Sequence, residues 1–491
     1  MNDTDAPQNP SDSGSPRRER RAARSRRKKG GAIAAGVLVL ALGAYAAVDA
    51  YDLVPGLPGV LTTEPQVEVQ TVPTPQARAQ QVPAPASAVD DSAPVPTQIP
   101  KEIDTVLKES KIKGFGLEVR DGLSDDVLYA KNETKPRTPA SVTKVLTAAA
   151  SLSAIGGETR LETTTDFDAD TNTLTLTGGG DVLLSAGVSD PGSVNGHGGL
   201  RTLAEDTAAA LKDENITEVA LDLDTSRYVG EDFDSGWERV DIAKGVITSI
   251  QPIMVDTAYI GSKQAEWRGR SEHPAEDAFT IFERELKKTG ITVTEAAAEP
   301  ESEDSKELAR VESATISEIV EYALVHSDNV VAEMLGNEVA IAQGKEGSLD
   351  NGPDAVLEAL GESVDLGRTH LVDTSGLSYD NRIAPHDLTT VLQASVVADD
   401  SLAGLISYFP VGGLTGTLHD RFGNEKNASG VVHAKTGTLS TVTSLAGGVL
   451  DAEGRYLVFS IQIDDVDKDK ILEARKTVDD IVTALANCGC R

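Results

Sequence analysis

Three short runs of this chain have the residue types and the order needed for acyl transfer by a serine. Each run combines a hydroxyl with an amine or an amide: Ser141-Val142-Thr143-Lys144, Ser327-Asp328-Asn329 and Lys435-Thr436-Gly437. A serine hydroxyl becomes a nucleophile when a nearby base removes its proton, and a neutral lysine amine is such a base. The pattern therefore predicts that Ser141 is a nucleophile and that Lys144 is its base.

The sequence around Ser141 predicts a helix that brings these two side chains together. Ser141 follows Pro139 and opens a run, 142–155, that is rich in Ala and Leu and contains no Gly or Pro. Such a run indicates a buried helix with a proline just before its start. Three residues turn a helix by about 300°, so Lys144 returns to the face that carries Ser141.

The same short patterns occur elsewhere in contexts that do not suit catalysis. Ser25 lies among arginines before an apolar segment, and Ser110 lies in a polar turn before a predicted strand, although both begin a Ser-x-x-Lys run. We interpret both as surface sites. A second Lys-Thr-Gly run begins at Lys288, and its Gly290 is predicted to end a helix before a strand.

The run at Lys435 continues a strand pattern that starts near residue 430 and extends to Thr438. A glycine within a strand often marks a place where another backbone approaches closely. We therefore expect Gly437 to admit the backbone of a substrate.

Composition and the N-terminal sequence predict where the protein resides. The net charge of −33 over 491 residues argues against nucleic acid, and against an anionic membrane surface, as a partner of the folded part. Basic residues are concentrated in 17–29, directly before the uncharged apolar segment 30–48. This order places the N-terminus in the cytoplasm and the rest outside. At about 18 residues the segment suits a signal anchor in the cell membrane; cleavage after Ala46, with secretion, is the alternative.

A linker follows the apolar segment. Residues 49–99 are rich in Pro, Val, Gln, Ala and Thr and show no sustained helix or strand period, which predicts a semi-rigid tether; a disordered stalk is the alternative. The only cysteines are Cys488 and Cys490. They can form a small strained disulfide loop or remain unpaired, and they are too few for a metal site. We predict no metal and no cofactor.

The strand and helix patterns predict an α+β fold with a discontinuous catalytic domain. Strands are expected at 115–119 and 127–130 and again at 441–449 and 456–463, with a closing helix at 471–486. Strands at both ends of the chain imply one antiparallel sheet flanked by helices. The predicted parts are a basic cytoplasmic tail (1–29), the anchor (30–48), the extracytoplasmic linker (49–99), the catalytic domain (100–158 and 311–491) and an inserted α+β domain (159–310).

The inserted domain alternates strands with turns and acidic loops. Strands are expected at 173–177 and 218–223, and Gly178 to Gly180 form a turn, because no nucleotide-binding Lys-Ser/Thr follows. A helix pattern resumes at Val311 and leads to Ser327.

With the motifs placed, the chain resembles the class C low-molecular-mass penicillin-binding proteins, the D-alanyl-D-alanine carboxypeptidase/endopeptidase family. The resemblance extends over about residues 100–486 and includes sequence around the motifs: 139–144, 326–333, 373–378 with Asn381 and Arg382, and 416–418. It implies a β-lactamase/transpeptidase-like fold, action on peptidoglycan stem peptides, and β-lactam antibiotics as inhibitors. Members carry inserts between the first two motifs, and the spacing here suggests one.

The resemblance also implies roles for individual residues. Ser141 attacks the carbonyl of the penultimate D-Ala, and Lys144 is the base, its pKa lowered by burial and by Lys435. Ser327 relays a proton to the leaving group, and Asn329 holds the acyl amide. Lys435, Thr436 and Gly437 lie along the substrate, and the backbone N–H groups of Ser141 and Thr438 form the oxyanion hole. Arg382 is a candidate for binding the carboxylate of a diaminopimelyl side chain; the alternative is that it forms a salt bridge within its loop. Asp241, near Trp237, is a candidate for binding the ammonium group; the alternative is that it is a solvated acid in a loop.

Other functions are compatible with the same motifs. A serine β-lactamase shares them but needs fast deacylation, and the insert and the long tether argue against it. A non-catalytic wall-binding protein is expected to lose the nucleophile or the lysine, and both are present. An esterase or D-aminopeptidase of the same fold, and the balance of carboxypeptidase against endopeptidase activity, stay open.

Overall fold

A computed structural model of the chain describes residues 97–110, 112–261, 268–295, 305–361, 364–398 and 401–488. The predicted tail and anchor, and the linker up to residue 96, lie outside the described residues, as does Cys490. In the part of the chain that is described, no helix has the length and apolar character needed to cross a membrane. Cys488 is in a disulfide.

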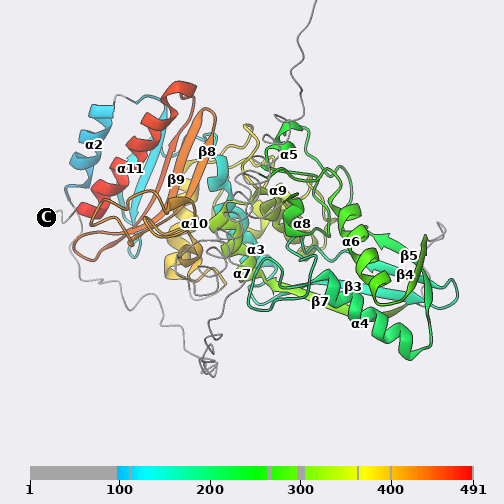
Figure 1. The fold of residues 1–491 in the computed structure, drawn as a ribbon. Coiled ribbons are helices and arrows are strands. Elements are labelled where there is room, and N and C mark those ends of the chain that lie inside the picture. Colours follow the sequence, from blue (N-terminus) through cyan, green and yellow to red (C-terminus); the bar gives the residue numbers. More distant parts are fainter. Residues whose placement is uncertain are drawn as a thin grey trace, which may run out of the picture. The chain divides into compact units, whose positions relative to one another are not determined.

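The first sheet is built from both ends of the described chain (Figure 1). All its pairings are antiparallel, in the order β2-β1-β10-β9-β8. Its strands are β1 (Phe115–Asp121), β2 (Val127–Lys131), β8 (Val432–Leu439), β9 (Val442–Leu450) and β10 (Tyr456–Ile463). This arrangement confirms the predicted antiparallel sheet with N-terminal and C-terminal strands, and with it the α+β class.

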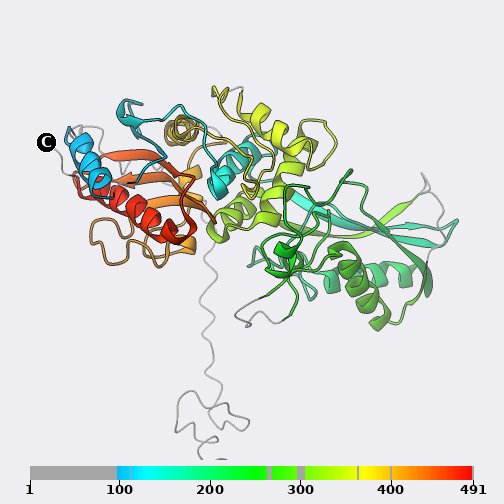
Figure 2. The ribbon, with the colours of Figure 1, turned by 90° about the horizontal axis from the view of Figure 1, so that it is seen from above.

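Helices cover both faces of this sheet, which explains why its central strands β1, β10 and β9 are buried along nearly their whole length. Two helices, α2 (Ile99–Ser110) and α11 (Ile471–Asn487), lie side by side on one face (Figure 2). Leu445 and Val449 of β9 pack into the cluster that these helices share, while Ala446 packs on the other side. There α10 (Pro385–Val397) contacts β1 and β10.

The second sheet belongs to the region predicted as an insert. Its order is β6-β5-β4-β3-β7; β4, β5 and β6 are parallel, and β3 is antiparallel to both β4 and β7. The strands are β3 (Arg160–Asp168), β4 (Thr173–Thr177), β5 (Glu218–Asp224), β6 (Thr292–Glu295) and β7 (Lys306–Thr315). Helices α4 (Leu200–Asp213) and α6 (Pro274–Lys288) pack with it in one apolar cluster. The second Lys-Thr-Gly run ends α6 as predicted, with Gly290 at φ +94°.

The remaining helices form the largest apolar cluster, and α3 contacts α7, α8 and α9 within it. They are α3 (Lys144–Ala154), α7 (Ile316–His326), α8 (Asn329–Ala342) and α9 (Gly352–Gly361), with a short α5 (Val240–Ala243) elsewhere in the chain. The helix expected from Val311 begins five residues later, at Ile316, because β7 continues to Thr315 and pairs there with Arg160. Thr315 then caps α7 in a capping box with Glu318.

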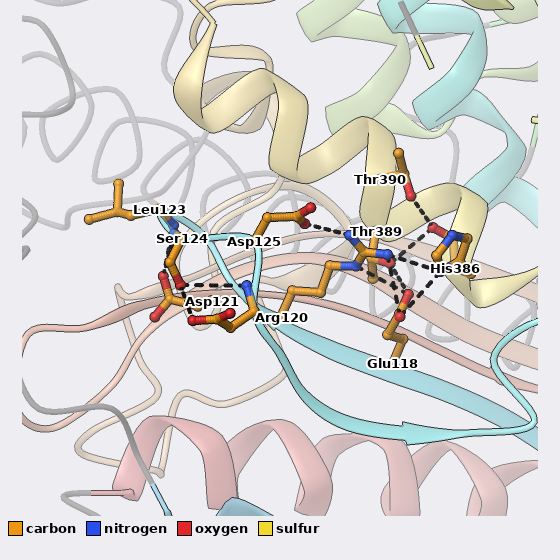
Figure 3. Close-up of polar contacts among 10 residues, drawn as sticks. Glu118, Arg120, Asp121, Leu123, Ser124, Asp125, His386, Thr389 and Thr390 are labelled. Atoms are coloured by element: carbon orange, nitrogen blue, oxygen red, sulfur yellow. Dashed lines mark hydrogen bonds and ion pairs between the residues drawn. The ribbon is translucent and has the colours of Figure 1, made fainter. Parts of the chain in front are cut away.

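A buried polar cluster attaches α10 to the first sheet (Figure 3). Glu118 and Arg120 of β1 are 1% and 5% exposed. Arg120 Nη2 lies 2.9 Å from His386 Nδ1, which is 3.3 Å from Glu118 Oε1. Thr389 of α10 donates to the second oxygen of the same carboxylate. Buried charges require such partners, so this cluster fixes the register of α10 on β1.

At the end of β1, Asp121 organises the turn to β2. One carboxylate oxygen accepts hydrogen bonds from the N–H groups of Leu123 and Ser124, both at 2.9 Å (Figure 3). The other oxygen accepts from Arg455, which immediately precedes β10. Burial favours a higher pKa for Asp121, but Arg455 and the hydrogen bonds outweigh it and hold the pKa below the ordinary value.

We expect Arg455→Met to lower the free energy of unfolding by about 3–5 kcal/mol, because it leaves the buried Asp121 carboxylate without its cation. Urea unfolding of the purified full-length protein at pH 7 measures this. The matched control is Lys476→Met, since the Lys476–Asp480 pair is largely exposed and should change stability by less than about 1 kcal/mol. Because the folded-state pKa of Asp121 is lowered, its contribution is present above about pH 4 and is lost as pH falls further. Equal effects of the two substitutions would contradict the assignment.

Candidate active site

Ser141 lies in a 3₁₀ turn, Ala140–Thr143, that leads directly into α3. The predicted helix is present, but its first turn is tighter than an α-helix. Residues three apart eclipse each other in a 3₁₀ turn, so Ser141 and Lys144 lie on one side, with Lys144 Nζ 3.1 Å from Ser141 Oγ. Ala140 enters the turn at φ +52°, and Gly376 packs so closely that a Cβ there would lie 2.0 Å from Ala140 O.

The Lys144 amine is directed at Ser141 by two other oxygens. Lys144 is 1% exposed, and its Nζ also lies 2.7 Å from Asn329 Oδ1 and 2.7 Å from the carbonyl oxygen of Ser375. Both of these oxygens can only accept. A neutral amine has two hydrogens and must donate both of them to these two oxygens. Its lone pair then faces the Ser141 hydroxyl. The geometry is that of a base.

Burial shifts this amine towards its neutral form. Burial lowers the pKa of Lys144 to about 8, although the negative charges of Asp373, Glu333 and Asp328 act in the opposite direction. The pKa of Lys435 is lowered well below its ordinary value by burial and by repulsion from Lys144. The expected repulsion between the two lysines is therefore seen on Lys435, whereas burial is the main cause at Lys144.

The Ser-x-Asn run forms the junction between α7 and α8. Ser327 ends α7 in a left-handed conformation, φ 54°, and Asp328 caps α8 by accepting from the N–H groups of Val330 and Val331. This sharp turn brings Ser327 Oγ 2.8 Å from Lys435 Nζ. Asn329 bonds to Lys144 and donates from Nδ2 to the carbonyl of Val246 at 2.9 Å.

Sequence reasoning did not identify Arg270, which supports this junction. Its guanidinium pairs with Asp328 Oδ2 at 2.9 Å, and both side chains are buried. It also donates to the carbonyls of Thr257 and Gly245. Burial opposes ionisation of Asp328, but Arg270 holds the Asp328 pKa below its ordinary value. No local pattern signals Arg270, because its ion-pair partner lies far along the chain.

Lys435 and Thr436 lie on β8, at the edge of the first sheet. The backbone of residues 410–412 covers the start of this edge by bonding to Val432 O and Ala434 N. Backbone groups on one side of a strand belong to alternate residues, so those of Thr436 and Thr438 face the same side, beyond this cover. Thr436 Oγ1 donates to Thr417 Oγ1 at 2.9 Å, and Lys435 Nζ donates to Thr436 O at 2.8 Å.

Gly437 lies where another segment of the protein packs closely against β8. A Cβ at this position would lie 2.1 Å from Ser444 Oγ and 2.7 Å from the carbonyl oxygen of Pro139. The backbone that approaches Gly437 closely in this structure is the protein's own, just before Ser141. The glycine allows β8 to pack against the turn that carries Ser141.

Arg382 and Asp241 have local partners. Arg382 Nη1 donates to the carbonyls of Tyr379 and Asn381, at 2.6 and 2.8 Å, and to Thr138 Oγ1 at 3.0 Å. These hydrogen bonds hold Arg382 to its loop, and Arg382 forms no ion pair with another residue in the described part of the chain. The Asp241 carboxylate pairs with Lys244 at 2.8 Å, and both residues lie at α5.

The structure thus brings the five main predicted residues into one hydrogen-bonded region. Lys144 joins Ser141 to Asn329, and Lys435 contacts Ser327, two residues before Asn329. Nearby, Trp237 donates its indole N–H to Asp373 at 3.0 Å, a contact that the sequence did not reveal. In the described part of the chain, no group of side chains has the composition of a metal site.

Comparison with known proteins agrees with this geometry. The model of the D-Ala-D-Ala carboxypeptidase 3 (S13) family matches residues 99–266 and 261–485. Carboxypeptidase DacB of Mycolicibacterium smegmatis is 31% identical over 487 residues, covering 96% of this chain and 99% of that protein. A carboxypeptidase of Mycobacterium tuberculosis is 30% identical over 427 residues, covering 85% of this chain and 90% of that protein.

Among solved structures, penicillin binding protein 4 of Haemophilus influenzae shares the fold, with a TM-score of 0.64 at 21% identity over 78% of this chain and 98% of that chain. The family match includes every predicted site residue and both sheets. The chain belongs to the D-Ala-D-Ala carboxypeptidase 3 (S13) family and is a serine-type D-Ala-D-Ala carboxypeptidase.

Proposed function

We propose that this enzyme is anchored in the cell membrane by residues 30–48, trims peptidoglycan stem peptides outside the cell, and uses Ser141 as its nucleophile and Lys144 as its base. The observation that carries the catalytic assignment is the set of three oxygens around Lys144 Nζ. Two of them are obligatory acceptors, so the lone pair of the neutral amine faces Ser141.

Acylation follows from this arrangement. Lys144 removes the hydroxyl proton of Ser141 as Oγ bonds to the carbonyl carbon of the penultimate D-Ala. The peptide C–N bond then breaks, and the proton passes through Ser327 to the departing amine of the terminal D-Ala. Ser327 suits this relay because its oxygen accepts from Lys435, which leaves its own hydrogen for the leaving group. Water then hydrolyses the ester, with Lys144 again as base.

The free edge of β8 supplies the substrate contacts. The N–H of Thr438 faces the uncovered side of this strand, and together with the N–H of Ser141 it stabilises the oxyanion. The Thr436 hydroxyl and the Lys435 cation attract the terminal carboxylate of the peptide. A penicillin presents an amide carbonyl and a carboxylate in the same relation, so it acylates the same serine. Arg382 and Asp241 stay proposals for contacts with a diaminopimelyl side chain, and crosslinked stem peptides are a second substrate to test.

We expect Ser141→Ala to abolish the covalent adduct that forms when the purified full-length protein is exposed to a penicillin. Intact-protein mass spectrometry measures the adduct. Ser110→Ala is the matched control, because Ser110 also begins a Ser-x-x-Lys run but lies at the end of α2, where its hydroxyl donates to Leu107 O. The control should retain the adduct for minutes or longer. An adduct on Ser141→Ala would contradict the assignment, and rapid drug hydrolysis without a lasting adduct would indicate a β-lactamase.

The rate of acylation should rise with pH up to about 8, because only the neutral form of Lys144 accepts the proton and burial lowers its pKa to about 8. Below that value the rate should fall about tenfold per pH unit. Stopped-flow acylation by a chromogenic penicillin between pH 6 and 9 tests this. Lys144→Arg should be inactive throughout, since a guanidinium stays protonated. A rate that does not change over this range would argue against Lys144 as the base.

The proposed anchor has its own test. The full-length protein expressed in a bacterium should sediment with the membranes, and deletion of residues 1–48 downstream of a cleavable secretion signal should release it in soluble form. N-terminal sequencing of the mature full-length protein distinguishes the two alternatives. A soluble product that starts directly after Ala46 would replace the anchor with a cleaved signal peptide.

A further inference from the structure

Glu333 is a buried carboxylate close to the catalytic centre that has no part in the mechanism above. It lies on α8 four residues after Asn329, and residues four apart share one face of a helix. Glu333 is 2% exposed. This face of α8 is the one that contacts Lys144 through Asn329.

The side-chain oxygens of Glu333 accept hydrogen bonds from two consecutive residues, Thr374 and Ser375. Its Oε1 accepts from the N–H of Ser375 at 2.8 Å. Its Oε2 accepts from the N–H of Thr374 at 3.2 Å and from Thr374 Oγ1 at 2.8 Å. The Thr374 carbonyl is held in turn by Thr147 Oγ1 of α3 at 2.6 Å. Glu333 therefore fixes the orientation of the peptide before Ser375.

The next peptide group carries the oxygen that Lys144 uses. The Ser375 carbonyl accepts from Lys144 Nζ at 2.7 Å, and the N–H of the same peptide, on Gly376, donates to Asp373 Oδ1 at 2.7 Å. With Glu333 holding the Ser375 N–H, the direction of this carbonyl is determined from both sides. One face of α8 thus controls both acceptors of the Lys144 amine: Asn329 directly, and Ser375 through Glu333.

We propose that Glu333 is a positioning residue of the catalytic centre, which orients the Ser375 carbonyl so that the lone pair of Lys144 points at Ser141; this rests on the proposed function. The hydrogen bonds from Thr374 and Ser375 favour the ionised carboxylate, which carries only acceptors, and they act against the burial that raises the pKa of Glu333. A glutamine in the same place has an NH₂ group, which is a donor, and this group would face at least one other donor, an N–H or O–H of Thr374 or Ser375. The Ser375 carbonyl would then change its direction, and the lone pair of Lys144 would no longer point at Ser141.

Glu333 also contributes charge to Lys144. The charged groups around this amine are Asp328 and Glu333 from α8, Asp373 from the loop before Ser375, and Lys435 from β8. The Glu333 charge raises the pKa of Lys144. Burial and Asp373 raise the pKa of Glu333 to about 8, so Glu333 gains its charge over the same pH range in which Lys144 loses its proton. Glu333→Gln removes this charge, so the pH below which acylation declines should move downwards by a fraction of a pH unit.

The test compares Glu333→Gln with Glu338→Gln in the full-length protein. Glu338 is on the same helix and is equally buried, but it pairs with Arg227 and Tyr228. The measurement is the rate of acylation by a chromogenic penicillin from pH 6 to 9, with melting temperature as a check on folding. We expect Glu333→Gln to slow the plateau rate by about 10- to 100-fold and to shift the decline to lower pH. Glu338→Gln should leave the rate within about twofold and the pH profile unchanged.

A third variant separates the orientation of the Ser375 carbonyl from the effect of the Glu333 charge. It also tests the proposal if Glu333→Gln fails to fold. Glu333→Asp keeps the charge but moves the carboxylate away from Thr374 and Ser375, because the side chain is shorter. The plateau rate of acylation should therefore fall without a shift of the pH profile. A Glu333→Gln rate within twofold of wild type, or a rate loss matched by Glu338→Gln, or a loss without any shift of the profile, would overturn the proposal. Wild-type protein that forms no adduct at all would overturn the proposed function, and this inference with it.

Discussion

The proposed mechanism depends on a buried amine whose pKa is low enough for its neutral form to be populated. Lys144 is almost inaccessible to water, yet all three of its hydrogen-bond partners are uncharged oxygens. A carboxylate in direct contact would stabilise the ammonium and end its use as a base. The nearest carboxylates are instead engaged by other donors. Asp328 is held by Arg270, and Asp373 accepts from Trp237. Their charges reach Lys144 only at a distance, so burial prevails.

The region predicted as an insert contributes directly to this centre. It supplies the carbonyl of Val246, which fixes the Asn329 amide, and Arg270, which holds Asp328. Arg270 also donates to Thr257, the middle of three consecutive residues with positive φ, Asp256–Ala258. Backbone of this kind is strained in residues other than glycine and persists only where its surroundings enforce it. The strained turn and the Ser-x-Asn junction are therefore held by one guanidinium.

The parts of this protein that follow from local sequence were predictable. The spacing of Ser141 and Lys144, the strands of the first sheet and the cap at Gly290 each depend on a few adjacent residues. Arg270, Glu333 and the Ser375 carbonyl could not be identified in this way, because each acts through contacts with distant segments. Gly437 was predicted as a place of close approach, but its packing against Pro139 could not be predicted, because the two residues are far apart in the sequence. The helix expected at Val311 starts at Ile316, because pairing with β3 extends the strand beyond the reach of any local helix signal.

Because two lysines are buried in one site, the charge of a bound substrate affects which of them is protonated. Burial lowers the pKa values of both Lys144 and Lys435, and the cation on either one disfavours the cation on the other. A substrate carboxylate placed beside Lys435 favours the charged form of that lysine. The positive charge then favours the neutral form of Lys144, which is the form that can accept the proton from Ser141. In the proposed mechanism, binding of the anionic end of the peptide and activation of Ser141 are therefore coupled electrostatically, so a substrate without that carboxylate should lose rate as well as affinity.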